Sequence, residues 1–135
     1  MSEPTVLFET RGAIGRITLN RPKALNALTL EQIRQIEPAL RRWATDPAIA
    51  AVVIDGAGDR AFCAGGDIRA LYDASVAGDE AFLVDFYQEE YTLNRLIKTY
   101  PKPYVALLDG ITMGGGVGLS VHGRYGVATE RITFA

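Results

Sequence analysis

The sequence predicts an α/β fold built around a parallel sheet. Two continuous apolar runs, Ala50–Ile54 and Tyr104–Leu108, are typical of strands that are buried on both faces. Helical patterns separate the strand-like runs, so that strand and helix alternate along the chain. Each of the two apolar runs is followed by a glycine-rich stretch, where the backbone is expected to turn toward the next helix.

Length and composition limit the classes of function. The chain has 135 residues, 48% hydrophobic and 22% charged, which is typical of one globular domain. The net charge is −2 without a basic stripe, so neither a nucleic-acid groove nor a membrane-binding patch is expected, and no apolar run is long enough to span a membrane. The single cysteine, Cys63, excludes an internal disulfide and favours a reducing, cytoplasmic location. With His122 as the one histidine, no metal site is expected.

A hairpin is expected at the N-terminus. Val6–Arg11 and Ile14–Leu19 are short β-type runs, and Gly12-Ala13 separates them. The segment Asn20–Lys23 then ends the second strand, because its proline has no N–H to donate to a sheet. Met1–Arg11 lacks a positively charged leader followed by an apolar core, so no signal peptide is expected.

A helix is predicted after this hairpin. Thr29 is a candidate N-cap, and Gln32 three residues later completes a capping box. Pro38 is expected to kink the helix or to restrict its first half, and Asp46-Pro47 ends it. The apolar residues at helical spacing are Leu30, Ile33, Ile36, Leu40 and Trp43.

The rest of the chain repeats the alternation. Residues 56–66 read as a loop, and residues 110–118 read as a second glycine-rich turn that leads into a helix ending at His122. The chain stops at Ala135 inside a strand-like run, so we expect it to be part of a longer domain. The further predicted elements are helices at Asp67–Tyr72 and Asp79–Lys98 and strands at Tyr125–Ala128 and Arg131–Phe134.

The second glycine-rich turn, Met113–Gly118, lies between a buried strand and a helix. Glycines there let a ligand approach the backbone N–H groups closely. The dinucleotide fingerprint fails because Leu119 stands where its third glycine belongs, and the nucleophile-elbow motif fails because His122 stands where its second glycine belongs. A tight packing turn without a ligand is the alternative interpretation.

The first turn, Ala61–Ile68, also follows a buried strand and opens a helix that Asp67 could cap. Two such turns can converge at one end of a sheet, where α/β proteins bind ligands. Two convergent backbone donors are what a carbonyl oxygen that gains negative charge requires, and each is worth roughly 3–4 kcal/mol in a transition state. A plain loop is again the alternative.

Several runs resemble the crotonase (enoyl-CoA hydratase/isomerase) superfamily in sequence and order: Asn20–Leu28, Ala61–Ile68, and Lys102-Pro103 followed by Gly110 and Gly114–Gly116. Glu89–Tyr91 and Gly110–Gly123 are most similar to the branch that hydrolyses 3-hydroxyisobutyryl-CoA in valine breakdown. The resemblance implies a ClpP-like spiral of ββα units, truncated after the second turn and its following strands. Residues 1–135 would be the N-terminal part of one catalytic domain whose C-terminal part is absent.

The resemblance also implies roles for individual residues. The N–H groups of Gly66 and Gly115 would form the oxyanion hole, and CoA would be part of the substrate, with no separate cofactor. Arg69 matches a position that is often basic and could face CoA phosphates, although a solvated surface arginine is equally compatible. The residues that would lie along CoA are Lys23, Ala24, Leu25, Ala64, Gly65, Asp67 and Ile68.

Two adjacent glutamates are alternative candidates for a residue of the site. Glu89 and Glu90 both fall near the edges of the apolar stripe formed by Phe82, Phe86, Leu93 and Ile97. Helical periodicity does not choose between them, and either carboxylate could reach solvent. The resemblance favours Glu90 as a residue that contacts substrate.

Gly118 separates the possible activities. It stands where hydratases of the superfamily place a catalytic glutamate, which favours hydrolysis over hydration because hydration needs two carboxylates. Thioester hydrolysis needs a polarised carbonyl and one carboxylate. The resemblance implies that the key carboxylates of the hydrolases lie beyond Ala135, so this chain alone is expected to be inactive. An enoyl-CoA hydratase or isomerase and an inactive CoA-binding chain remain the alternatives. A homo-oligomer or association with the absent part is a further expectation. Cys63 is expected to pack, and His122 to pack or to cap a helix, rather than to react.

Overall fold

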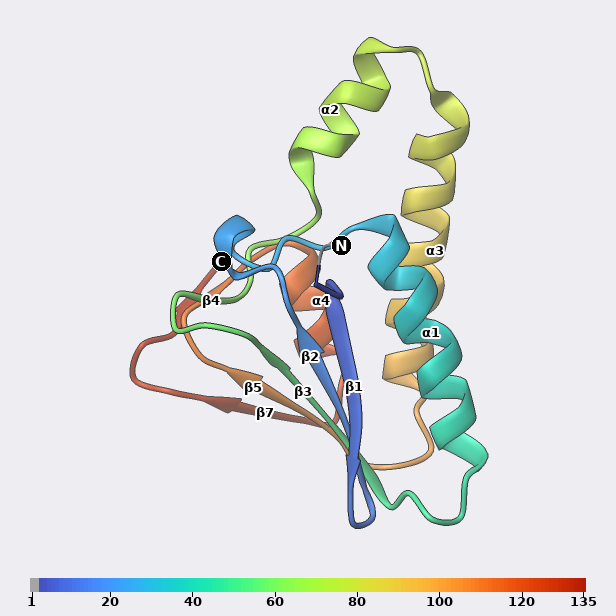
Figure 1. Cartoon of the computed structure of the whole chain (residues 1–135), viewed down its shortest axis with the longest axis vertical. Helices are drawn as coiled ribbons and strands as arrows, with labels where there is room; N and C mark the ends of the chain where they lie inside the picture. Colours follow the sequence, from blue (N-terminus) through green and yellow to red (C-terminus); the bar gives the residue numbers. More distant parts are fainter. Residues whose placement is uncertain (1–2) are drawn as a thin grey trace.

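The structure is a computed structural model and describes residues 3–135. These residues form two sheets and four α-helices (Figure 1). The strands are β1 (Val6–Arg11), β2 (Ile14–Leu19), β3 (Ala51–Gly56), β4 (Ala61–Cys63), β5 (Tyr104–Leu108), β6 (Ile111–Thr112), β7 (Tyr125–Ala128) and β8 (Thr133–Phe134). The helices are the short 3-10 helix η1 (Pro22–Ala24), α1 (Leu30–Thr45), α2 (Ile68–Val76), α3 (Glu80–Lys98) and α4 (Gly115–Val121).

The larger sheet has the order β1-β2-β3-β5-β7. β1 and β2 form the predicted antiparallel hairpin, in which Val6 pairs with Leu19. β2, β3, β5 and β7 are parallel neighbours, which confirms the predicted α/β fold with a parallel sheet. Strands β3 and β7 lie on either side of β5, so segments far apart in the sequence become neighbours in the sheet.

A second, smaller sheet contains β4, β6 and β8, all parallel. Each strand of the larger sheet from β3 onward is followed directly by one strand of the smaller sheet, and helices follow the first two such pairs. This repetition is the spiral of ββα units expected from the resemblance. β4 and β6 fall within the stretches that the sequence indicated as glycine-rich loops. They were not predicted as strands, because three and two residues are too few to show a period.

The core occupies one face of the larger sheet. Ile17 and Ile54 are fully buried there against residues of α1, α3 and α4 such as Ile36 and Leu93. The expectation that β3 and β5 are buried on both faces is wrong for the described residues, since Leu107 is 38% exposed on the other side. That face also carries the ion pair between Arg16 and Asp55, at 2.6 Å.

Hydrogen bonds at helix termini agree with the sequence. The Thr29 hydroxyl accepts from the Gln32 backbone N–H, and the Gln32 side chain accepts from the Thr29 N–H, which is the predicted capping box. Asp67 and Asp79 cap α2 and α3 in the same way, by accepting backbone N–H groups. α1 continues unbroken through Pro38 to Thr45. None of the helices within residues 3–135 has the length and apolarity needed to cross a bilayer.

Candidate functional site

The two glycine-rich turns meet in space. A Cβ atom built on Gly115 would lie 3.2 Å from the backbone nitrogen of Gly66, and one built on Gly114 would lie 3.5 Å from the Cα of Gly65. The parallel pairing of β4 with β6 places the two turns side by side, because each turn follows one of these strands. Neither turn is therefore an isolated packing loop.

Both central glycines keep a free backbone N–H. The neighbouring donors are used: Asp67 N–H donates to the Leu28 carbonyl at 2.8 Å, and Gly116 N–H donates to the Met113 carbonyl at 2.8 Å. The N–H groups of Gly66 and Gly115 have no acceptor among residues 3–135. Gly115 is the first residue of α4, where backbone donors have no partner within the helix. Two unused donors thus lie side by side.

Glu90 is the glutamate that faces these donors. A Cβ atom on Gly115 would meet its Oε1 at 3.0 Å, so the carboxylate lies next to both turns. The side chain is half-buried, and this burial raises its pKa above that of an ordinary glutamate. Glu89 instead points outward and receives two hydrogen bonds from Arg34, at 2.8 and 2.7 Å. The structure separates two residues that the helical period left equivalent.

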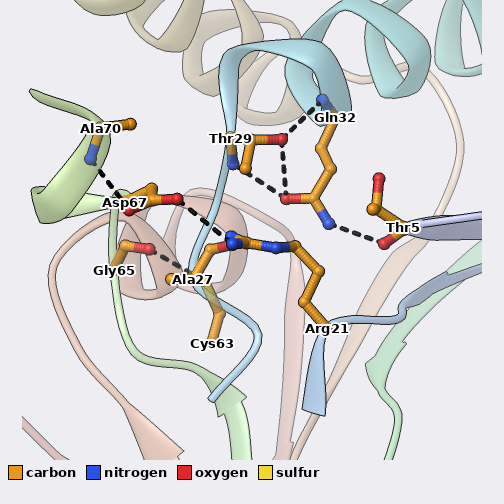
Figure 2. A network of polar contacts seen from close by, with 9 residues as sticks. All are labelled: Thr5, Arg21, Ala27, Thr29, Gln32, Cys63, Gly65, Asp67 and Ala70. Atoms are coloured by element: carbon orange, nitrogen blue, oxygen red, sulfur yellow. Dashed lines mark hydrogen bonds and ion pairs between the residues drawn. The ribbon is translucent and has the colours of Figure 1, made fainter. Parts of the chain in front are cut away.

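A polar network holds the first turn in place (Figure 2). Arg21 donates to the Ala27 carbonyl at 2.6 Å and to the Asp67 carboxylate at 3.2 Å. The Leu28 N–H donates to the Gly65 carbonyl at 2.7 Å, so the 21–28 segment is attached to the turn from both sides. The Asp67 carboxylate also caps α2, so it is engaged within the chain, and a contact of Asp67 with CoA remains a prediction.

Asn26 is a residue whose importance the sequence reasoning missed. It is buried, its φ is +55°, and its side-chain amide donates to the carbonyls of Ala57 and Ala61 at 3.0 and 2.9 Å. Its Oδ1 accepts the Arg21 N–H at 2.8 Å. Asparagine tolerates the left-handed region, which was the available sequence signal. One amide therefore joins the 21–28 segment to the stretch from Ala57 to Ala61.

The remaining predicted CoA contacts lie around the first turn. Lys23 and Ala24 are exposed in η1, and Leu25 is half-buried directly after it. Ile68 and Arg69 are exposed at the start of α2, while Ala64 and Gly65 are largely covered. Exposure of Arg69 is compatible with a phosphate contact and with a solvated side chain alike.

Cys63 and His122 differ in burial. His122 is exposed at the end of α4. Cys63 is fully buried, and its thiol points to the Gly65 carbonyl at 3.7 Å. Burial raises the pKa of Cys63 to about 11, so a thiolate is disfavoured at neutral pH. Within residues 3–135 no group of three acidic, histidine or cysteine side chains could hold a metal ion.

We expect the Cys63 thiol to be unreactive in the folded protein. A water-soluble disulfide reagent at neutral pH should label less than a few per cent of the chain in the time that fully labels the urea-unfolded chain. Burial keeps the reagent away from the sulfur and disfavours the thiolate that would react with it. Mass spectrometry of the labelled protein measures this, and rapid labelling of the native protein would contradict the packing seen here.

Comparison with known proteins places this geometry in a family. The family model described as enoyl-CoA hydratase/isomerase matches residues 14–135. Mitochondrial 3-hydroxyisobutyryl-CoA hydrolase of Danio rerio is 62% identical over 130 residues, which is 96% of this chain and 34% of that protein. The Homo sapiens protein of the same name is 58% identical over 130 residues, again 96% of this chain and 33% of its own length. The chain thus spans about a third of these relatives.

Solved structures agree with the fold. An enoyl-CoA hydratase from Rhodobacter sphaeroides superposes with a TM-score of 0.94 at 50% identity, covering 98% of this chain and 39% of that one. A carnitinyl-CoA dehydratase from Mycobacterium thermoresistibile gives a TM-score of 0.96 at 44% identity, with the same coverage of 98% and 39%. The family match and the ββα architecture agree, and the chain belongs to the enoyl-CoA hydratase/isomerase family.

Proposed function

We propose that this chain carries the oxyanion hole and part of the CoA-binding surface of an acyl-CoA thioester hydrolase. The observation that supports it is the pair of unused N–H groups on Gly66 and Gly115 beside the half-buried Glu90 carboxylate. The substrate we propose is 3-hydroxyisobutyryl-CoA, an intermediate of valine breakdown, because the similar proteins of Danio rerio and Homo sapiens bear the name of that hydrolase.

The chemistry follows from where charge develops. When a water oxygen attacks the thioester carbonyl, the carbonyl oxygen becomes negative, and donors fixed at that point lower the barrier. Gly66 and Gly115 offer two such donors without any movement of a side chain. The C–S bond then breaks, and 3-hydroxyisobutyrate and CoA are released after the sulfur takes up a proton. The carboxylate that activates water is expected beyond Ala135, so the 135-residue chain by itself should have little activity.

The CoA portion would lie across the first turn. We propose contacts with Lys23, Ala24 and Leu25 on one side and with Ala64, Gly65, Asp67, Ile68 and Arg69 on the other. These two groups are neighbours because the 21–28 segment is hydrogen-bonded to the turn. CoA enters and leaves as part of the substrate, and no separate cofactor is proposed.

An enoyl-CoA hydratase is the second candidate, because a hydratase is among the similar solved structures. The full-length gene product should release CoA thiol from 3-hydroxyisobutyryl-CoA and should not hydrate crotonyl-CoA. Hydration without thiol release would overturn the hydrolase proposal. Turnover by the 135-residue chain at the full-length rate would overturn the role given to the missing carboxylates.

Assembly and location are also proposals. We propose that this chain associates with the remaining part of the domain, and that the complete protein either stays a monomer or forms a homo-oligomer. The free Cys63 fits a reducing compartment. A cytoplasmic location rests on that residue, whereas the names of the relatives say mitochondrial. Fractionation of cells followed by detection of the chain decides between these compartments.

Glu90→Gln should lower kcat/KM for the hydroxyacyl substrate about 10- to 100-fold, the effect of losing one charge-assisted hydrogen bond. Burial raises the pKa of Glu90. If the carboxylate is the active form, wild-type activity is present above this pKa and falls on acidification, at a higher pH than for an ordinary glutamate. The variant should lack this part of the pH profile.

The matched control for this experiment is Glu89→Gln, one residue earlier on α3. Its carboxylate faces Arg34 and solvent, so its rate and pH profile should equal those of the wild type. Equal losses in both variants would indicate a general effect on α3 and would contradict a specific contact by Glu90.

A further inference from the structure

A second contact between α3 and α4 lies one helical turn beyond the first. Glu90 on α3 meets Gly115 on α4, and four residues later on α3 the side chain of Asn94 meets Gly118. Residues four apart on one helix and three apart on the other share a face, so both contacts lie in the same seam between the helices. The seam therefore runs from the two free N–H groups to Asn94.

The Asn94 amide lies directly on the Gly118 backbone. A Cβ atom on Gly118 would lie 2.8 Å from both Oδ1 and Nδ2 of Asn94, so any side chain at position 118 would displace the amide. Nearby hydroxyls on α3 are used locally, since Thr92 and Thr99 donate to carbonyls of their own helix. The Asn94 amide forms no hydrogen bond with a described residue, and it is half-buried. An amide with both donor and acceptor unused is therefore held beside the candidate site.

We propose that Asn94 determines specificity for acyl groups that carry a hydroxyl, by hydrogen bonding that hydroxyl. This deepens the proposed function and rests on a thioester carbonyl lying between Gly66 and Gly115. One helical turn advances about 5 Å, so the amide lies about that far along α3 from the Glu90 contact, and the proposal places the third carbon of the acyl chain beside it. An amide can both donate to and accept from a hydroxyl. The amide fits at this position because Gly118 has no side chain.

The test compares two ligands that differ by one hydroxyl. These are the dethia analogues of 3-hydroxyisobutyryl-CoA and isobutyryl-CoA, in which a methylene group replaces sulfur so that neither is hydrolysed. Calorimetry with the full-length protein should show tighter binding of the hydroxyl ligand. Asn94→Leu should weaken the hydroxyl ligand about 10- to 100-fold relative to the other, because a site built for a hydroxyl discriminates by this hydrogen bond.

Gly118→Ala provides a second variant that leaves Asn94 in the sequence. Its new methyl group would displace the amide and should reduce the same preference. The control is Gln88→Leu, which removes an exposed amide from the same helix and should leave the ratio unchanged. Equal weakening of both ligands by Asn94→Leu, or an unchanged ratio in both site variants, would overturn the proposal.

The same protein distinguishes failure of this proposal from failure of the proposed function. Release of CoA from authentic 3-hydroxyisobutyryl-CoA by the wild type tests the hydrolase assignment alone. A wild-type protein that binds the hydroxyl ligand preferentially through Asn94 but releases no CoA would refute hydrolysis and support the contact. A protein that hydrolyses the thioester with an unchanged ratio in Asn94→Leu would refute the contact and support hydrolysis.

Discussion

Gly115→Ala is expected to reduce CoA release by the full-length protein about 100- to 1,000-fold, the range seen when one oxyanion donor is lost. The added methyl group would lie 3.2 Å from the Gly66 nitrogen and 3.0 Å from the Glu90 carboxylate. It would occupy the place that the carbonyl oxygen needs, and it would cover one donor while pushing on the carboxylate. The loss should appear mainly in kcat, because the oxygen gains its charge in the transition state.

The fold of the Gly115→Ala variant should survive, because Gly115 has no positive φ and the carboxylate that the methyl group meets is the end of a flexible side chain. The contact of 3.2 Å with the Gly66 nitrogen requires a shift of only a few tenths of an ångström. Urea unfolding measured beside the assay therefore separates a blocked site from a damaged fold. Gly126→Ala is the control, since its methyl group would make an ordinary contact of 3.6 Å with Leu108. Activity of Gly115→Ala within a few-fold of wild type would refute the oxyanion role.

Gly110→Ala is expected to cost at least about 3 kcal/mol in the free energy of unfolding. The φ of Gly110 is +86°, a region that alanine enters only under strain. In addition, the new Cβ atom would lie 2.3 Å from the carbonyl oxygen of Arg60 and 2.6 Å from its carbon. Backbone atoms cannot rotate away, so the junction of β5 with β6 would have to shift.

Gly12→Ala separates the two causes of this loss. Gly12 has a φ of +57°, and a Cβ atom there would have no neighbour within 4 Å. The free energy of unfolding of this variant should fall by only about 1 kcal/mol, which is the cost of the left-handed conformation. Chemical denaturation of both variants gives the difference, which we assign to the backbone overlap at Arg60. Equal losses for the two variants would contradict that assignment.

Much of the fold was predictable because its long elements carry strong periodic patterns. The hairpin Val6–Leu19 and the capping box of Thr29 and Gln32 were placed at the correct residues. The smaller sheet was not predicted as a unit, because its three strands are two or three residues long and depend on partners distant in the sequence. Exposure of Leu107 was also missed, since an apolar run by itself does not show how many faces of a strand are covered.

The candidate site was predictable in part. Glycine-rich turns were recognisable as turns, but the pairing of Gly66 with Gly115 came from resemblance and not from periodicity. The choice of Glu90 over Glu89 depends on which side of α3 meets α4, and this requires packing in three dimensions. Asn26 was missed because an amide that joins distant segments leaves no local pattern. Asn94 was missed because its contact with Gly118 depends on how α3 packs against α4.

The two donors of the site come from segments far apart in the sequence, and they become neighbours only after β4 pairs with β6. A ligand that bridges the two donors can bind only the folded chain, because the unfolded ensemble does not bring them together. Binding and folding are then thermodynamically linked: ligand at 100 times its dissociation constant would add about 2.7 kcal/mol to stability. Abundant substrate would thus protect the chain against unfolding. The loss of stability caused by a mutation in either turn would have its largest effect on the folded fraction when substrate is scarce.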